Sequence, residues 1–195
     1  MRPRITLVAQ GTTKALRAAT FGADDGLDAV GRRHAERLAG TLGKVDRVFV
    51  SPALAARETA EALGLAEASV EPLLADCDYG RWKGLKFNQV ILREPRKLMS
   101  WIKKPETAPH GGETIPEVRS RVEDWMRAHS REDGHTVAVT HSAVIRAAIV
   151  HVIQAEPASF WRIDVVPLAQ ADFRTNGRRW VFRSLAVPDV EDEDG

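Results

Sequence analysis

The clearest pattern in the chain is a short apolar run that turns directly into a second apolar segment. Residues 136–140 (TVAVT) are apolar or β-branched, and after His141 and Ser142 the run 143–150 (AVIRAAIV) is apolar almost all round. This pattern predicts a buried strand feeding a buried helix, as in α/β proteins with parallel strands. Ligands in such sheets bind at the carboxyl ends of the strands. We therefore expect His141 at that edge, beside helix N-terminal amides that favour anions.

Further strand patterns occur on both sides of this unit. They are predicted over residues 4–8, 46–50, 70–74, 162–166, 169–174 and 178–185. The dipeptide Asn176-Gly177 lies between the last two runs and is a strong signal for a hairpin turn. The chain is therefore expected to end in antiparallel β-structure.

Helical periodicity fills the intervals between the strands. Asp28 can cap a helix that runs to about Leu42, and Ser51-Pro52 have the residue types of an N-cap and a first helical position. A third helix is predicted after a Thr114 cap. Its core face is marked at helical spacing by Ile115, Val118, Val122, Trp125, Met126 and His129.

Two segments lack a clean pattern. Residues 14–26 are loop-like, with glycines and paired aspartates. Residues 85–110 mix scattered apolar positions with many basic residues and three prolines, which suggests two short helices in an excursion over the sheet edge. This excursion could form a binding loop or lid over the cleft, or a packed connector with a solvated basic face.

The predicted fold is a three-layer α/β/α arrangement with a mostly parallel central sheet, helices on both faces and an antiparallel C-terminal hairpin. It is expected to form one domain over residues 1–187, followed by an acidic tail at 188–195. The length of 195 residues suits a single domain with a sizeable core.

Composition narrows the class of protein. Hydrophobic content of 44% and charged content of 28% are ordinary for a globular protein, and a net charge of +1 gives no support for binding nucleic acid or an acidic membrane surface. The single Cys77 excludes an internal disulfide and fits a reducing compartment. Because no apolar run approaches the ~20 residues that span a bilayer, we expect a cytoplasmic protein.

Four predicted strand ends should meet at one edge of the sheet. They carry Gln10, Ser51, Asp76 and His141, and Glu113 follows a Gly-Gly loop that could reach the same edge. Alone, His141 could merely cap a strand. The convergence makes this edge the candidate site. The expected ligand-binding residues are Gln10, Gly11, Thr13, Ser51, Glu113, His141 and Ser142.

Five segments resemble, in order, the motifs of the histidine phosphatase superfamily, which has the phosphoglycerate-mutase-like fold. Residues 7–13 (LVAQGTT) are similar to LVRHGET, and residues 51–60 (SPALAARETA) to SPLxRAxQTA. Residues 74–84 (LADCDYGRWKG) are similar to LxExDFGxWEG, residues 111–114 (GGET) to GGES, and residues 139–142 (VTHS) to VSHG. The resemblance covers nearly the whole chain.

The resemblance implies transfer of a phosphoryl group onto a histidine, with a carboxylate as general acid, two arginines holding the phosphate, and no metal or other cofactor. This chain departs from that pattern. Gln10 stands at the nucleophile position, and Ala9 and Ala55 stand at the two arginine positions. Three matching positions are retained. Glu113 and His141 are unchanged, and Asp76 stands where the motif has the longer glutamate.

These replacements have direct chemical consequences. The carboxamide nitrogen of Gln10 has its lone pair delocalised into the carbonyl, so it cannot attack phosphorus. Each missing arginine removes a bidentate phosphate partner. Arg57 lies about 200° around the helix from Ala55 and should face away. Basic residues that could substitute are Lys14, Arg17, Lys83, Lys86 and Arg93, although a surface role is the default for each.

Three functions remain open. The first is a histidine-phosphatase-fold protein without phosphohistidine chemistry, which keeps a cleft for a small phosphate-containing ligand or a partner. The second is a phosphomonoesterase, mutase-like or other hydrolytic enzyme with altered chemistry, in which His141 and Asp76 act as acid and base and Gln10 orients a water. The third is a purely structural or interaction protein, possible as a homodimer.

Overall fold

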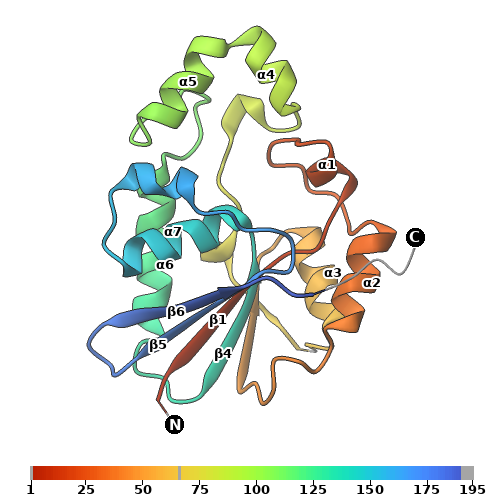
Figure 1. The fold of residues 1–195 in the computed structure, drawn as a ribbon, viewed down its shortest axis with the longest axis vertical. Coiled ribbons are helices and arrows are strands. Elements are labelled where there is room, and N and C mark those ends of the chain that lie inside the picture. The colour runs from red at the N-terminus through yellow and green to blue at the C-terminus, as the bar shows by residue number, and fades with distance from the viewer. Residues whose placement is uncertain (1, 66, 190–195) are drawn as a thin grey trace.

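One twisted sheet forms the centre of the molecule (Figure 1). The computed structural model describes residues 2–65 and 67–189, and within them six strands pair in the order β3-β2-β4-β1-β5-β6. The strands β3, β2, β4 and β1 are parallel neighbours, while β5 is antiparallel to both β1 and β6. The strand bounds are β1 Arg4–Ala9, β2 Arg47–Val50, β3 Ser69–Val70, β4 His135–Thr140, β5 Gln170–Thr175 and β6 Trp180–Ala186.

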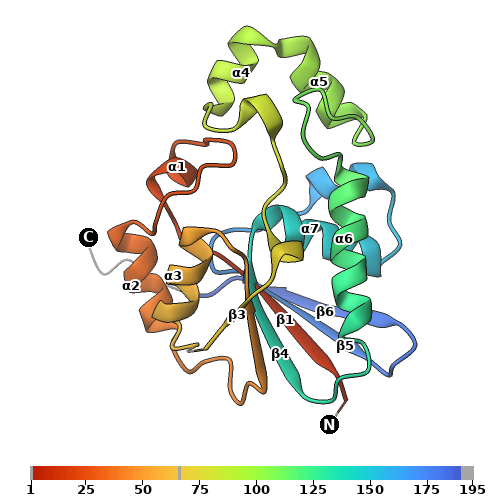
Figure 2. The ribbon, with the colours of Figure 1, turned by 180° about the vertical axis from the view of Figure 1, so that it is seen from behind.

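Helices cover both faces of this sheet (Figures 1 and 2). The helices α2 (Ala29–Arg37) and α3 (Leu54–Ala62) pack together on one face, and α6 (Ile115–Ala128) and α7 (Ser142–Val152) pack together on the other. The predicted three-layer α/β/α fold is confirmed. None of the helices in the described part of the chain is long and apolar enough to cross a bilayer.

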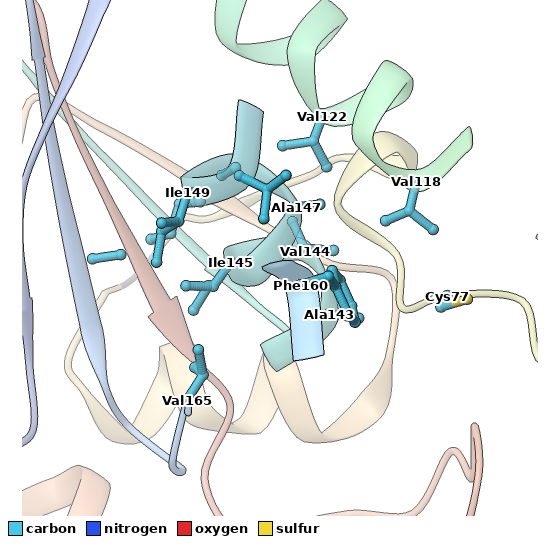
Figure 3. Close-up of a cluster of buried hydrophobic side chains, with 14 of the residues drawn as sticks. Cys77, Val118, Val122, Ala143, Val144, Ile145, Ala147, Ile149, Phe160 and Val165 are labelled. Carbon is cyan, nitrogen blue, oxygen red and sulfur yellow. The ribbon is translucent and has the colours of Figure 1, made fainter. Parts of the chain in front are cut away.

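The alternation of side chains along the central strands builds two cores. In β1, Ile5 and Leu7 belong to the cluster on the α6–α7 face, whereas Val8 belongs to the cluster under α2 and α3. Figure 3 shows the first cluster, in which Val144, Ile145 and other apolar residues of α7 lie between the sheet and α6. Because apolar residues surround most of α7, the sequence pattern correctly predicts a buried helix after β4.

The C-terminal β-structure matches the prediction only in part. Strands β5 and β6 form the expected antiparallel hairpin, with Gly177 at a φ of 85° between them. The predicted strand at 162–166 was wrong: a 3₁₀ turn over Pro157–Arg162 ends at its first residue, and residues 163–166 form neither strand nor helix. The carbonyl of Ile163 then accepts a hydrogen bond from Arg146 of α7 at 2.8 Å rather than from a neighbouring strand. Residues 190–195 of the predicted acidic tail lie outside the described residues.

Three other elements differ in extent from the prediction. Residues 14–26 contain a short helix, α1 (Lys14–Arg17), whose N-cap Thr13 accepts a hydrogen bond from Leu16 N. The helix α2 ends at Arg37 rather than near Leu42, because the chain continues through successive turn hydrogen bonds to Gly40 and Gly43, both at positive φ. The short strand or extended piece predicted at 70–74 is confirmed only at Val70, the last residue of β3; Pro72–Leu74 form a 3₁₀ turn that begins on the proline.

The excursion consists of the two short helices predicted, α4 (Phe87–Arg93) and α5 (Pro95–Lys103), and lies beyond the sheet (Figure 1). An aromatic cluster fastens it to the body. Trp101 of α5 contacts Trp82, His110 and Trp161, with ring centroids 4.5–5.7 Å apart. This packing gives α5 the character of a packed connector.

Asp28 fixes the start of α2 and ties it to the preceding loop. Its carboxylate accepts hydrogen bonds from Gly31 N at 2.7 Å, from Thr12 Oγ1 at 2.8 Å and from Arg17 Nε at 2.6 Å. Burial raises the pKa of Asp28, but these hydrogen bonds outweigh that effect and lower the pKa from 3.8 to about 2.

We expect Asp28→Ala to lower the free energy of unfolding by about 1–2 kcal/mol at neutral pH, the usual cost of losing an N-cap. Since the folded-state pKa is depressed, the contribution of Asp28 is fully present above pH 4 and is lost as the pH falls through about 2. Urea denaturation at several pH values measures both effects. Glu36→Ala, on the exposed side of α2, is the control and should change stability little; a stability difference between Asp28→Ala and wild type that persists unchanged at pH 2 would contradict the expectation.

Candidate functional site

Strand register brings three of the predicted residues together. The pairing of Ala9 with Thr140 aligns the ends of β1 and β4, and Gln10 N donates a hydrogen bond to Thr140 O at 2.8 Å. On the other side of β4, Ser51 N donates to Val139 O at 2.9 Å. Gln10, Ser51 and His141 therefore follow three adjacent parallel strands at one edge of the sheet.

Asp76 reaches the same edge through a loop rather than a strand. Thr140 Oγ1 donates to Leu74 O at 2.7 Å, which holds the 3₁₀ turn against β4. From α6, Arg121 donates to the carbonyl oxygens of Leu73 at 2.6 Å and of Asp76 at 3.0 Å. The backbone of Asp76 is therefore positioned by both β4 and α6.

A cleft of about 360 Å³ opens at this edge. Of the predicted site residues, it is lined by Gln10, Thr13, Ser51, Asp76 and His141. The rest of the wall comes from residues 15–16, 20, 22–24, 52–53, 75 and 77–79 and from Lys83. No described residue of the 85–110 segment lines it.

Glu113 does not line the cleft, contrary to its place in the predicted ligand-binding set. Its carboxylate accepts hydrogen bonds from Arg121 Nε at 2.8 Å and Nη2 at 3.0 Å, and from Asp78 N at 2.9 Å. The 111–113 loop thus brings Glu113 behind the 76–78 segment, where the arginine on α6 neutralises it. Its role in this geometry is to hold that segment in place.

Gly11 and Ser142 also stand outside the lining. Gly11 N donates to Thr59 Oγ1 at 3.0 Å, which joins the end of β1 to α3. A Cβ atom at Gly11 would stand 3.0 Å from Leu27 Cδ2 and 3.2 Å from Gly31 O, so a larger residue here would press on both neighbours. Ser142 is the first residue of α7 and directly follows His141.

The predicted cap of the second helix was wrong. Helix α3 begins at Leu54 with Ala53 at the N-cap, two residues later than the Ser51-Pro52 pattern suggests. The side chain of Ser51 is engaged instead by His141, and the free amide of Leu54 donates to Asp24 Oδ1 at 2.8 Å. A carboxylate from another loop therefore replaces the local serine at this helix N-terminus.

His141 is held between Ser51 and Asp76. Its Nε2 atom lies 2.8 Å from Ser51 Oγ, and its Nδ1 atom lies 3.9 Å from Asp76 Oδ2, beyond hydrogen-bond distance. Only 6% of His141 is exposed, and Ser51 is fully buried. The serine hydroxyl therefore orients the imidazole rather than attacking a substrate.

The ring of His141 is neutral at pH 7. Burial lowers its pKa below the ordinary value of 6.5, and the nearby carboxylates of Asp76 and Asp24 oppose this shift only in part. Burial also raises the pKa of the Tyr79 hydroxyl and of the Cys77 thiol, so neither is charged at neutral pH. The fixed charges in the cleft wall therefore come from other residues.

Among the described residues, three carboxylates and one ammonium supply the fixed charge of the cleft: Asp24, Asp76 and Asp78 against Lys83. Asp24 was not among the predicted site residues, because it lies in the 14–26 loop that shows no periodicity; the paired aspartates there were the only local signal. Asp78 also caps its own turn, because its Oδ1 accepts from Gly80 N at 2.9 Å. The cleft wall is therefore acidic.

Most of the basic residues weighed as arginine substitutes point elsewhere. Lys83 lines the cleft, whereas Lys14, Lys86 and Arg93 do not, and Arg57 is exposed on α3, as its helical position predicts. Arg17 is bound to Asp28 at 2.6 Å and to Thr12 at 3.2 Å. Within residues 2–65 and 67–189, no group of three or more His, Cys, Asp or Glu side chains is placed to hold a metal ion.

Comparison with known proteins identifies relatives that cover nearly the whole chain. The sequence profile of the histidine phosphatase superfamily (branch 1) matches residues 5–188. Phosphoserine phosphatase 1 of Hydrogenobacter thermophilus is 29% identical over 173 residues, which cover 84% of this chain and 82% of that protein.

Two further relatives show how far the likeness extends. A Mycobacterium tuberculosis protein named as bifunctional is 28% identical over 89% of this chain, which spans only 51% of that protein's length. The structure of phosphoserine phosphatase from Entamoeba histolytica, in complex with 3-phosphoglyceric acid, superposes with a TM-score of 0.85. The match covers 95% of this chain and 98% of that chain at 19% identity, and it shows a common fold.

Proposed function

We propose, from the premise that the chain belongs to the histidine phosphatase superfamily (branch 1), that it has kept the family's cleft as a binding site but forms no phosphohistidine. The observation that carries this proposal is the position of Gln10. It directly follows β1 and lines the cleft, at the place where the resemblance puts the attacking histidine.

The chemistry of a carboxamide supports the loss of phosphoryl transfer. The nitrogen lone pair of Gln10 is delocalised into its carbonyl group, so it offers no nucleophile to phosphorus. His141 remains in the cleft, but its Nε2 atom is engaged by the fully buried Ser51. Neither nitrogenous side chain at this edge is therefore arranged for attack.

The surroundings of Gln10 give a phosphoryl group little stabilisation. At the two positions that resemble the family's arginines stand Ala9 and Ala55, each 3% exposed. The amide of Leu54 at the start of α3, a natural anion site, is already bonded to Asp24. Losing one preorganised donor often costs roughly a hundred- to a thousand-fold in rate, and several are absent here.

We expect the wild-type protein to hydrolyse p-nitrophenyl phosphate no faster than a buffer blank and to carry no phosphorylated side chain after rapid acid quench. Mass spectrometry of the quenched peptides measures the second point. Gln10→His is the informative variant: it restores an imidazole but leaves the three carboxylates in place, so we expect it to remain without turnover.

Two results would contradict these expectations. Turnover in wild type that disappears in His141→Gln, or a trapped phosphohistidine, would show that phosphoryl transfer survives. A large gain of phosphatase activity in Gln10→His would show that the carboxylates do not oppose the reaction, and that Gln10 alone blocks it.

A second candidate function is hydrolysis by general acid–base catalysis at His141 and Asp76. Burial lowers the pKa of His141 and so provides a neutral base, and Asp76 Oδ2 lies 3.9 Å from its Nδ1 atom. The same assay with carboxylic esters tests this alternative. Ester turnover that is lost in both His141→Gln and Asp76→Asn would support it, whereas turnover unaffected by either change would count against it.

A further inference from the structure

We propose that the excursion formed by α4 and α5 docks on a membrane surface that contains anionic lipids, as a peripheral contact that does not cross the bilayer. The proposal is independent of the chemistry of the cleft, because no described residue of the 85–110 segment lines it. It rests on exposed apolar side chains and exposed cations that occur together on these two helices, at the end of the molecule that projects beyond the sheet (Figure 2).

The two helices carry large apolar side chains that the core does not use. Leu92 on α4 is 82% exposed, more than any other large apolar residue in the described part of the chain, and Met99 on α5 is 47% exposed. The buried face of the excursion is supplied by other residues, Val90 of α4 and Leu98 and Trp101 of α5. The full exposed apolar set of the two helices is Phe87, Ile91, Leu92 and Met99. Because contiguous exposed apolar residues often mark an interaction site, this outer surface is a candidate for one.

The same segment is strongly basic, although the whole chain has a net charge of only +1. Residues 85–110 contain two acidic residues, and their six basic residues are all exposed: Lys86, Arg93, Arg96, Lys97, Lys103 and Lys104. One of the two acids, Glu94, is already matched, because its carboxylate accepts hydrogen bonds from Arg81 at 2.7 and 3.1 Å. Of the six cations, Lys97 lies 3.5 Å from Glu94, and the other five form no ion pair with a described residue.

On α5 the apolar and basic side chains share one face. A shallow hollow of about 430 Å³ is lined there by Pro95, Arg96, Met99, Ser100, Lys103 and Lys104. Helical spacing explains the arrangement, because Met99 lies three positions after Arg96 and four before Lys103. Lysine and arginine can lay their methylene stems along apolar surface while their charged heads reach outward. Apolar residues bordered by cations on an exposed helix are typical of helices that lie in the interface of anionic membranes.

A bilayer surface matches both properties of the excursion. Lipid phosphates can pair with the cations, and the boundary of the acyl chains can take up Leu92 and Met99. A nucleic acid backbone would engage the cations but would leave these apolar side chains in water. The short helices suffice for this role, because an interfacial helix lies in the plane of the membrane and does not span it.

The test is co-sedimentation of the full chain with vesicles made of equal parts of phosphatidylglycerol and phosphatidylcholine. We expect binding to phosphatidylcholine alone to be at least about ten-fold weaker, since each Lys or Arg near an anionic surface strengthens binding roughly five-fold. Arg96→Gln combined with Lys103→Gln should weaken binding to the anionic vesicles by at least about ten-fold. Leu92→Ser combined with Met99→Ser should weaken it by about ten-fold through lost apolar contact. All four residues are exposed, so these variants should fold.

The controls change matching side chains outside the excursion. Arg178→Gln combined with Arg179→Gln removes two exposed arginines at the β5–β6 turn, and Val187→Ser removes an apolar side chain that is 65% exposed after β6. Neither control should weaken vesicle binding. The proposal is overturned if the anionic vesicles bind no better than phosphatidylcholine, or if either control weakens binding as much as the corresponding change in α4 and α5. It is also overturned if Leu92→Ser with Met99→Ser binds like wild type, or if a short DNA duplex binds more tightly than the anionic vesicles, because the surface would then act on charge alone.

Discussion

Gly112→Ala is expected to lower the free energy of unfolding by at least about 3 kcal/mol, the upper end of overpacking penalties. A Cβ atom at this position would overlap the carbonyl oxygen of Asp78 and would stand 2.7 Å from Gly80 N. Both are backbone atoms, so no side-chain rotation relieves the clash. The two segments are also pinned together, because Glu113 N donates to Asp78 O at 2.8 Å and Arg81 N donates to His110 O at 3.0 Å.

The clash would also reach the cleft. Asp78 lines it, and the crossing with Gly112 fixes the path of the 76–80 segment. Urea denaturation measures the stability change, and the amide shifts of Asp76 and Asp78 report the displacement. Gly111→Ala is the control: a Cβ there meets nothing within 4 Å, so its cost is the strain of a φ of 80°, about 1–2 kcal/mol. Equal losses in the two variants would contradict the close-approach explanation.

Trp82→Ala is expected to lower the free energy of unfolding by about 3–5 kcal/mol, the usual cost of deleting a buried tryptophan. Trp82 is 1% exposed and contacts the rings of Phe21, Trp101 and His110 at centroid distances of 5.0–5.7 Å. Its indole Nε1 also donates to Glu94 Oε2 at 3.3 Å. One side chain therefore joins the 14–26 loop, α5 and the 110–113 loop.

The same change should loosen one wall of the cleft, because Phe21 belongs to the loop that carries Asp24. Denaturation followed by tryptophan fluorescence gives the stability loss, and hydrogen exchange of residues 20–24 gives the local effect. Leu92→Ala, 82% exposed on α4, is the control and should stay within about 0.5 kcal/mol of wild type. A loss of unfolding free energy below about 1 kcal/mol in Trp82→Ala would show that the aromatic cluster does not hold the excursion against the rest of the protein.

Regular elements with a strong hydrophobic period were predictable from the chain alone. The β4–α7 unit, the helix capped by Thr114 and the β5–β6 hairpin are where the patterns place them, because periodicity, caps and turn residues act over a few neighbouring positions. The same reasoning fails at 162–166, where an apolar run is held by a bond from Arg146 instead of a strand partner. A run of about five residues is too short for its periodicity to distinguish a strand from an irregular segment.

In the candidate site, too, the sequence predicts some features and not others. The polarity of the parallel strands was sufficient to expect Gln10, Ser51 and His141 at one edge, since every parallel strand ends on that side. The pairing of side chains in and around the site was not predictable. The amide of Leu54 donates to Asp24, Arg121 holds Glu113 outside the cleft, and Ser51 lies against His141. Local pattern carries no information on which distant side chains meet, so the acidic sign of the cleft emerges only when the packed chain brings the loop of Asp24 and the loop of Asp76 and Asp78 into the wall of one cleft.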